Sequence, residues 1–159
     1  AVASEWQDVI YKDVDNYYLE ATTTSAGAPG AGGTFGIVYG AEALPVGAWT
    51  HLAATYDRAY LRLYVNGVEV AELAAGGAIA SSTSPLTIGG DGSWGQYFRG
   101  TIDEVRVYDT ALTAAEIQTD MNTPVAQGTL DTEAPPASHI PGAPPSTKQS
   151  QPGRPKISE

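Results

Sequence analysis

The feature of this 159-residue sequence that most constrains its fold is the dipeptide Asn66-Gly67, which separates two stretches of alternating apolar residues at 61–65 and 68–71. Asn and Gly both tolerate a positive φ angle, which the two central residues of a type I′ turn require. Apolar residues that recur at every second position are typical of strands rather than helices. The dipeptide therefore predicts a tight β-hairpin.

The turn also predicts the register of this hairpin, because a turn of fixed length sets which residues lie opposite each other. The expected pairs are Val65 with Val68, Tyr64 with Glu69 and Leu63 with Val70. Side chains alternate between the two faces of a strand. We therefore expect a core face made of Leu63, Val65, Val68 and Val70, and a solvent face made of Arg62, Tyr64 and Glu69.

Further short strands are expected along most of the chain. Runs rich in β-branched and aromatic residues predict strands at 8–11, 16–21, 35–39, 85–89 and 97–108, with a turn at 12–15 and a long flexible loop at 22–33. One short helix is expected after Thr113, where Glu116 completes a capping box, and it should end by Pro124. This pattern predicts an all-β fold, an antiparallel β-sandwich or jelly roll with one short C-terminal helical turn.

The composition divides the chain into two segments. All Trp, Tyr and Phe residues lie at or before Tyr108, and eight of the 11 Pro residues lie at or after Pro124. A segment without aromatic residues buries too little apolar surface to offset the entropy cost of ordering it. We therefore predict a domain at residues 1–123 and a Pro-rich disordered linker or tail at 124–159.

Charge and Cys content exclude several classes of protein. The formal net charge is −10, which disfavours binding to nucleic acid and to anionic membranes. The sequence has no Cys, so disulfides and thiolate metal sites are excluded. No apolar run approaches the roughly 20 residues of a membrane helix. We expect neither a nucleic-acid partner nor membrane insertion.

Several segments, in this order and spacing, resemble the laminin G-like domains of the concanavalin A-like lectin/glucanase superfamily. They lie at 49–57 (WTHLAATYD), 61–67 (LRLYVNG), 86–89 (LTIG) and 98–108 (FRGTIDEVRVY), and a final segment spans 111–117. The resemblance implies two antiparallel sheets packed as a jelly roll. It also implies an accessory module of secreted or cell-surface bacterial proteins that binds carbohydrate or protein ligands, often with calcium at one rim.

The resemblance begins near Trp6, whereas full members usually have several earlier strands. We therefore expect a partial, N-terminally truncated domain with an open sheet edge and a partly uncovered apolar face. A sheet with unpaired N–H and C=O groups tends to recruit another strand. Self-association, or pairing with a segment of the parent protein, is the expected consequence.

Glycosidase activity is not expected, although the same fold hosts glucanases. A retaining glycosidase needs two carboxyl groups about 5–5.5 Å apart. Asp103 and Glu104 are adjacent, so a regular strand would point them to opposite faces. The E-x-D-x-x-E pattern of those glucanases is also missing. We assign no catalytic residue.

A ligand site is expected around Trp94, which lies in a Gly-rich loop far from any core position. Sugars stack on exposed aromatic rings and form hydrogen bonds to nearby polar side chains. The candidate binding residues are therefore Trp94, Asp91, Gln96 and Tyr97. The alternative is that Trp94 folds back to cover the end of the sandwich. Trp6 and Trp49, by contrast, are expected to belong to the core.

Calcium is the one candidate cofactor. This ion prefers six to eight oxygen ligands from carboxylates, carbonyls and water. Asp13 and Asp15 share an oxygen-rich turn, and Asp103 belongs to the segment that resembles the end of the family domain. These three residues are the candidate metal ligands.

The sequence thus predicts a non-catalytic carbohydrate-binding or adhesion module of a larger secreted or cell-surface bacterial protein. Its expected partners are a glycan or an extracellular protein ligand and the other domains of the parent protein. The alternatives are a structural spacer, a protein–protein interaction domain and, last, a glycoside hydrolase.

Overall fold

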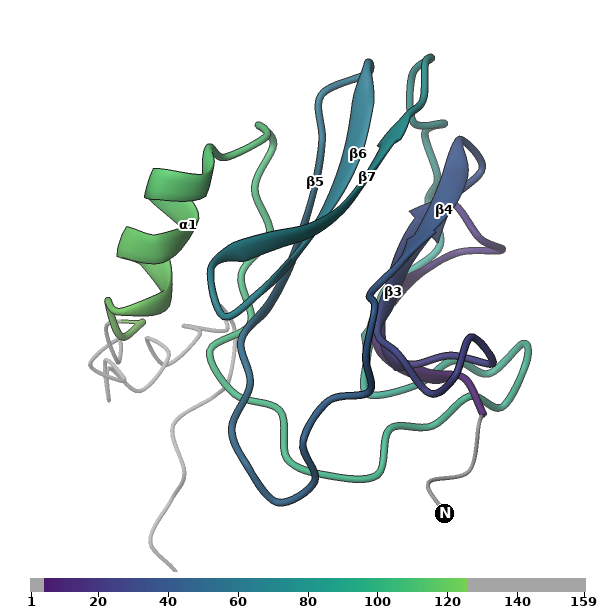
Figure 1. Cartoon of the computed structure of the whole chain (residues 1–159). Helices are drawn as coiled ribbons and strands as arrows, with labels where there is room; N and C mark the ends of the chain where they lie inside the picture. Colours follow the sequence, from purple (N-terminus) through teal and green to yellow (C-terminus); the bar gives the residue numbers. More distant parts are fainter. Residues whose placement is uncertain (1–4, 126–159) are drawn as a thin grey trace, which may run out of the picture. The chain divides into compact units, whose positions relative to one another are not determined.

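Two antiparallel sheets face each other in a computed structural model that describes residues 5–125 (Figure 1). The larger sheet has the strand order β4-β3-β2-β1-β8, and the smaller has the order β5-β6-β7. The strands of the larger sheet are β1 (Gln7–Lys12), β2 (Tyr17–Thr22), β3 (Gly30–Gly33), β4 (Gly36–Tyr39) and β8 (Leu86–Ile88). Those of the smaller sheet are β5 (Leu52–Tyr56), β6 (Tyr60–Val65) and β7 (Val68–Ala74). The predicted all-β, antiparallel sandwich is confirmed.

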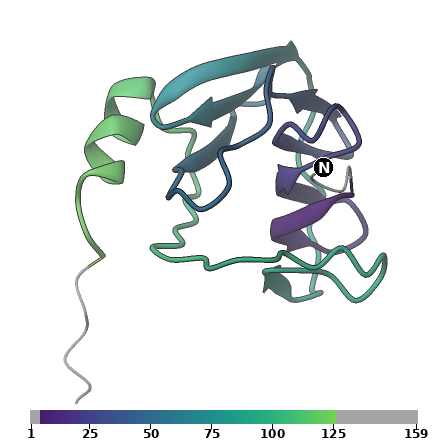
Figure 2. The ribbon, with the colours of Figure 1, turned by 60° about the horizontal axis from the view of Figure 1, so that its bottom comes forward.

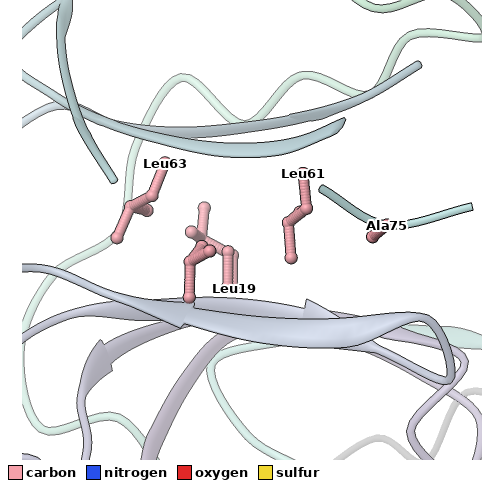
Figure 3. Packing of buried hydrophobic residues seen from close by; sticks show 6 residues of the cluster. Leu19, Leu61, Leu63 and Ala75 are labelled. Carbon is pink, nitrogen blue, oxygen red and sulfur yellow. The ribbon is translucent and has the colours of Figure 1, made fainter. Parts of the chain in front are cut away.

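The core lies between the two sheets. The larger sheet contributes the buried side chains of Leu19, Ala31 and Val38, and the smaller contributes those of Leu61 and Leu63. Leu19 and the two β6 leucines point toward one another across the interior (Figure 3). Because side chains alternate along a strand, the neighbours of Leu19 on β2 face the opposite, outer side of the larger sheet. That outer side carries the candidate site.

The Asn66-Gly67 turn is confirmed, since both residues have positive φ angles of 50° and 74°. The two pairs nearest the turn have the predicted register, Val65 with Val68 and Tyr64 with Glu69. The third expected pair is wrong, because a bulge between Leu63 and Tyr64 places Ala71 opposite Leu63. An extra residue in one strand shifts all later pairs by one position.

The predicted faces of this hairpin are only partly correct. Leu63 is fully buried, but Val68 and Val70 are 59% and 39% exposed. Tyr64 is 3% exposed, although it was expected to face solvent. The sequence of the hairpin does not reveal the helix α1 (Ala114–Met121), which lies on the side of the smaller sheet away from the larger one (Figures 1 and 2). That side of the smaller sheet is therefore partly covered and does not face solvent alone.

The capping box of α1 is confirmed. The Glu116 backbone N–H donates to the Thr113 hydroxyl over 3.3 Å, and the Thr113 N–H donates to the Glu116 carboxylate over 2.7 Å. The helix ends at Met121, before Pro124 as expected. It is too short to cross a membrane, and no other helix in the described part of the chain could do so.

Two predicted segments are wrong. The loop expected at 22–33 contains β3, a Gly-rich strand that sequence propensity does not favour. The strand expected at 97–108 does not form; Tyr97 makes one isolated bridge to Asp8, and no strand follows it up to residue 108. The Arg106 guanidinium instead donates to the Asp120 carbonyl over 2.7 Å, which ties this segment to α1 rather than to a sheet.

A cleft of about 1330 Å³ is lined by residues of both sheets and of the segment 98–112. Leu52 and Leu61 line it from the smaller sheet, and Ile10 and Leu19 line it from the larger one. Trp49 also borders the cleft and is 71% exposed, so its expected place in the core is wrong. The predicted Pro-rich tail lies outside the described residues from position 126 onward, and the domain boundary stays a prediction.

Candidate functional site

The outer side of the larger sheet carries a second, smaller pocket of about 270 Å³. Strands β1 and β2 and the loop after β8 all contribute to it. We call it the aromatic-acidic pocket, and its lining residues are Trp6, Tyr11, Asp15, Tyr18, Glu20, Trp94 and Gln96. Tyr18 and Glu20 flank Leu19 on β2, so alternation turns them away from the core and into this pocket.

Aromatic rings form much of the wall. Trp6 meets Tyr18 edge-on with ring centroids 6.3 Å apart, and it meets Tyr39 in the same manner at 6.2 Å. Edge-to-face pairs of this kind are a favourable aromatic geometry. Trp6 is half-buried here on the outer side, so it does not belong to the core between the sheets, as was expected.

Trp94 stands at the mouth of the pocket and is 59% exposed. Its indole N–H donates to the Tyr11 hydroxyl over 3.0 Å, and the Asp15 backbone N–H donates to the same hydroxyl over 3.1 Å. The indole is thus fixed at one edge while much of its surface stays open to solvent. The expectation that Trp94 is exposed beside polar groups agrees with this geometry, and its binding role remains to be tested.

Asp91 holds the loop that carries Trp94. It is 2% exposed, and its carboxylate accepts hydrogen bonds from the backbone N–H groups of Trp94 and Gln96. Burial alone would raise the pKa of Asp91, but these bonds and the side chain of Asp8 lower it. Asp91 is therefore an anchor for the loop, and its carboxylate is taken up by that role.

Tyr97, the remaining candidate binding residue, is 61% exposed and does not line the pocket. Its ring packs closely against Gly90, whose φ of 147° favours glycine. The Gln96 carbonyl accepts a hydrogen bond of 3.0 Å from the Asp8 N–H, which joins this part of the loop to β1. Of the four candidates, Trp94 and Gln96 line the pocket, Asp91 holds the loop that carries them, and Tyr97 lies outside the lining.

Two buried carboxyl groups that were not among the sequence candidates lie at the base of this site. Asp8 and Glu20 are cross-strand neighbours on β1 and β2 and are 0% and 1% exposed. No N–H group or hydroxyl group donates a hydrogen bond to either Asp8 oxygen or to Glu20 Oε2. The groups within reach of Asp8 are the carboxyls of Glu20 and Asp91.

The electrostatics of the pair follow from this burial. Burial raises the pKa of Glu20, and the neighbouring Asp8 raises it further. Burial also raises the pKa of Asp8, because a charged carboxylate is poorly solvated there. The pocket lining contains no Lys or Arg that could offset this charge. A sequence signal did exist, since each residue is the only acid in its strand and has apolar or aromatic neighbours on one side, Val9-Ile10-Tyr11 after Asp8 and Tyr17-Tyr18-Leu19 before Glu20.

The three candidate calcium ligands do not gather in one place in the described structure. The Asp13 carboxylate accepts a hydrogen bond from the Ser82 hydroxyl, and Asp15 lies at the aromatic-acidic pocket. Asp103 Oδ1 accepts from the backbone N–H of Glu104 over 2.8 Å. Within residues 5–125, no three His, Cys, Asp or Glu side chains come together as a metal site would require.

Asp103 and Glu104 also lack the regular strand on which they were placed. Glu104 has a φ of 54°, and its carboxylate binds the Arg106 guanidinium at 3.0 Å. These contacts occupy both carboxylates in local structure. They offer no support for an acid–nucleophile pair.

Comparison with known proteins then gives the family. A family model described as the concanavalin A-like lectin/glucanases superfamily matches residues 2–118. The chain belongs to this superfamily. Both the resemblance noted in the sequence and the two-sheet fold agree with that membership.

The chain is also similar in sequence to a region of Pappalysin-1. The chain is 40% identical to the protein of Mus musculus over 82 residues and 38% identical to that of Homo sapiens over 84 residues. Each match covers 48% of this chain but only 5% of Pappalysin-1. A solved S-layer domain-containing protein from Clostridium thermocellum is 27% identical, with 75% of this chain and 64% of that chain covered and a TM-score of 0.37.

Proposed function

We propose that this domain is a non-catalytic carbohydrate-binding module and that the aromatic-acidic pocket is its sugar site. The observation that carries the proposal is the exposed Trp94 ring, fixed at the mouth of a pocket whose other walls are aromatic and acidic. Aromatic rings present an apolar face with specific geometry, and fixed polar groups orient a ligand. The volume of about 270 Å³ suits a single sugar ring rather than a long buried chain.

A non-enzymatic role is supported by the contacts of the acidic residues. Asp103 and Glu104 are engaged with neighbouring groups, and Asp91 holds a loop. The matched region is a small part of Pappalysin-1, which supports an accessory module within a larger protein. A secreted or cell-surface setting, with a glycan or an extracellular protein as ligand, is part of the same proposal.

A glycan array, with and without calcium, is the first test, and calorimetry on the best ligand is the second. We expect Trp94→Ala to weaken binding by tenfold or more, because the buried face of one large side chain contributes about 1.5–3 kcal/mol. Trp94→Phe should retain part of the affinity, since it keeps an aromatic face and loses only the N–H bonded to Tyr11.

Trp49→Ala is the matched control, because Trp49 is 71% exposed and lies away from the pocket. It should leave the affinity unchanged. If the Trp94 and Trp49 variants bind equally well, the assignment of the site is wrong. If no glycan binds the wild-type domain, the proposed function itself is wrong.

A further inference from the structure

The aromatic-acidic pocket has a charge pattern that selects among sugars. The carboxyl groups of Glu20 and Asp15 line it, and Asp8 lies opposite Glu20 on the neighbouring strand β1. The six salt bridges of the described residues all use other carboxylates; Arg62, for example, pairs with Asp57 and Glu72 at 2.8 Å each. Within the described residues, Arg62, Arg99 and Arg106 thus pair outside this pocket, and neither Lys nor Arg is among its lining residues.

The buried carboxyl groups also have unused hydrogen-bonding capacity. Three of the four oxygens of Asp8 and Glu20 are buried and receive no hydrogen bond from an N–H group or a hydroxyl group, so the two carboxyls can share only their own proton. An unsatisfied buried polar atom costs stability, and a buried negative charge costs more unless a positive group accompanies it. A ligand that brought N–H donors and a positive charge would supply what both residues lack.

The rings around these carboxyls favour the same kind of ligand. Trp6, Tyr11, Tyr18 and Trp94 line the pocket, and the electron-rich face of an aromatic ring attracts an ammonium group. Aromatic cages with acidic neighbours are a known solution for binding ammonium ions. An anionic sugar would meet repulsion from the carboxyl groups, and from a chain of net charge −10.

We infer that the pocket binds an amino sugar whose free ammonium group enters between the aromatic rings and lies against Glu20 and Asp8. This inference rests on the proposed function and names the substrate class of that same site. When the ammonium enters, it replaces a proton held by the carboxyl pair, and that proton is released to solvent. The titratable groups around the ammonium are Asp8, Asp15, Glu20, Tyr11 and Tyr18, with Asp91 behind Asp8.

The test compares two oligosaccharides of equal length, an oligomer of β-1,4-linked glucosamine and its fully N-acetylated counterpart. Acetylation removes the positive charge and keeps the sugar backbone. Calorimetry at about pH 6, where an amine carries its charge, should show the glucosamine oligomer binding roughly tenfold or more tightly, as expected of a hydrogen bond between charged groups. Repeating the titration in buffers of different ionisation enthalpy should reveal proton release on binding.

Glu20→Gln is the decisive variant, because it keeps the shape of the side chain but cannot release a proton to become a carboxylate. It should abolish the preference for the glucosamine oligomer while leaving weak binding of the N-acetylated one. Glu69→Gln is the matched control, since it makes the same side-chain change at an exposed carboxylate on β7 that does not line the pocket. Asp8→Asn provides a second test, and urea melts show whether each variant is folded.

The outcomes separate the two proposals. Equal affinity for the two oligomers, or equal losses in Glu20→Gln and Glu69→Gln, overturns the amino-sugar assignment and leaves a neutral sugar site in place. Failure of every oligosaccharide to bind overturns the sugar site itself. A glucosamine preference that is lost in Glu20→Gln and kept in Glu69→Gln supports both.

Discussion

Replacing Gly67 should test the fold at the point where the hairpin turn meets the helix. Gly67 has a φ of 74°, and its carbonyl accepts a hydrogen bond of 3.3 Å from the Gln118 side chain. A Cβ added at Gly67 would lie 2.8 Å from Gln118 Cγ and 3.5 Å from Met121 Cε. Gly67→Ala therefore combines two costs, backbone strain and crowding against α1.

The two costs can be separated with a second glycine. Gly47 has nearly the same φ, 75°, but a Cβ there would have no atom within 4 Å. Gly47→Ala should therefore cost only the strain of a left-handed backbone, about 1–2 kcal/mol. Gly67→Ala should cost that amount plus about 1–3 kcal/mol of overpacking, because Gln118 Cγ is held by a helix and cannot simply swing away.

Urea unfolding of the two variants and the wild type measures both free energies. Adding Gln118→Ala to Gly67→Ala removes the crowded Cγ and should bring the loss close to that of Gly47→Ala, after subtraction of the effect of Gln118→Ala alone. Equal losses in Gly67→Ala and Gly47→Ala would refute the reasoning, because α1 would then not lie against the turn. Gly67→Val should be worse than Gly67→Ala, since a β-branched residue resists positive φ more strongly.

Three other predictions concern stability and association. The free energy of unfolding should fall as pH rises above about 4, because Asp8 and Glu20 keep protons in the folded state that the unfolded chain releases. Urea melts at several pH values should show a flatter pH dependence of this free energy in Glu20→Gln, and the same dependence as in the wild type would contradict the prediction. Thr113→Ala should cost about 0.5–2 kcal/mol through loss of the helix cap, and a loss near zero in the same melts would count against the capping box. Sedimentation at high protein concentration should show self-association through the edge strand β5, and Ala54→Lys, at an exposed position of β5, should reduce this self-association. A protein that stays monomeric at all concentrations would exclude the open-edge interpretation.

Local signals predicted part of this fold correctly. The Asn66-Gly67 turn, the nearest strand pairs and the Thr113 capping box all depend on interactions within a few residues of one another. The bulge beside Leu63 is different, because nothing in the hairpin sequence marks the place where a residue is left unpaired. One such shift was enough to misplace Val70 relative to the core.

Long-range partners explain the other differences. A strand needs a neighbour that accepts its hydrogen bonds, and the strand-like residues of 98–108 have no such neighbour among the described strands. Conversely, the Gly-rich β3 is poor in strand propensity but lies between β2 and β4, where its small residues allow close approach. At Gly32, for example, an added Cβ would lie only 2.6 Å from the Tyr18 hydroxyl oxygen.

In the candidate site, too, residues marked by local sequence could be predicted and residues brought together by long-range pairing could not. Trp94 could be found from the sequence, because an aromatic residue in a Gly-rich loop has no local reason to be there. Its neighbours Trp6 and Tyr11 could not be assigned, since aromatic residues near strands are ordinarily core. Asp8 and Glu20 become neighbours only through the register of β1 and β2, and that register contains two irregular steps near Asp8.

The position of the buried carboxyl pair bears on why the site exists at all. A chain selected only for stability would place apolar or hydroxyl side chains at Asp8 and Glu20, because unsatisfied buried polar atoms cost about 1–3 kcal/mol each. Marginally stable proteins accept such costs mainly where function requires them. Here the cost falls on the outer side of a sheet whose inner side already forms the core, at a pocket lined by four aromatic residues of which Trp94 is exposed. Stability lost at that place is therefore better explained by a ligand that satisfies the carboxyls than by any need of the fold.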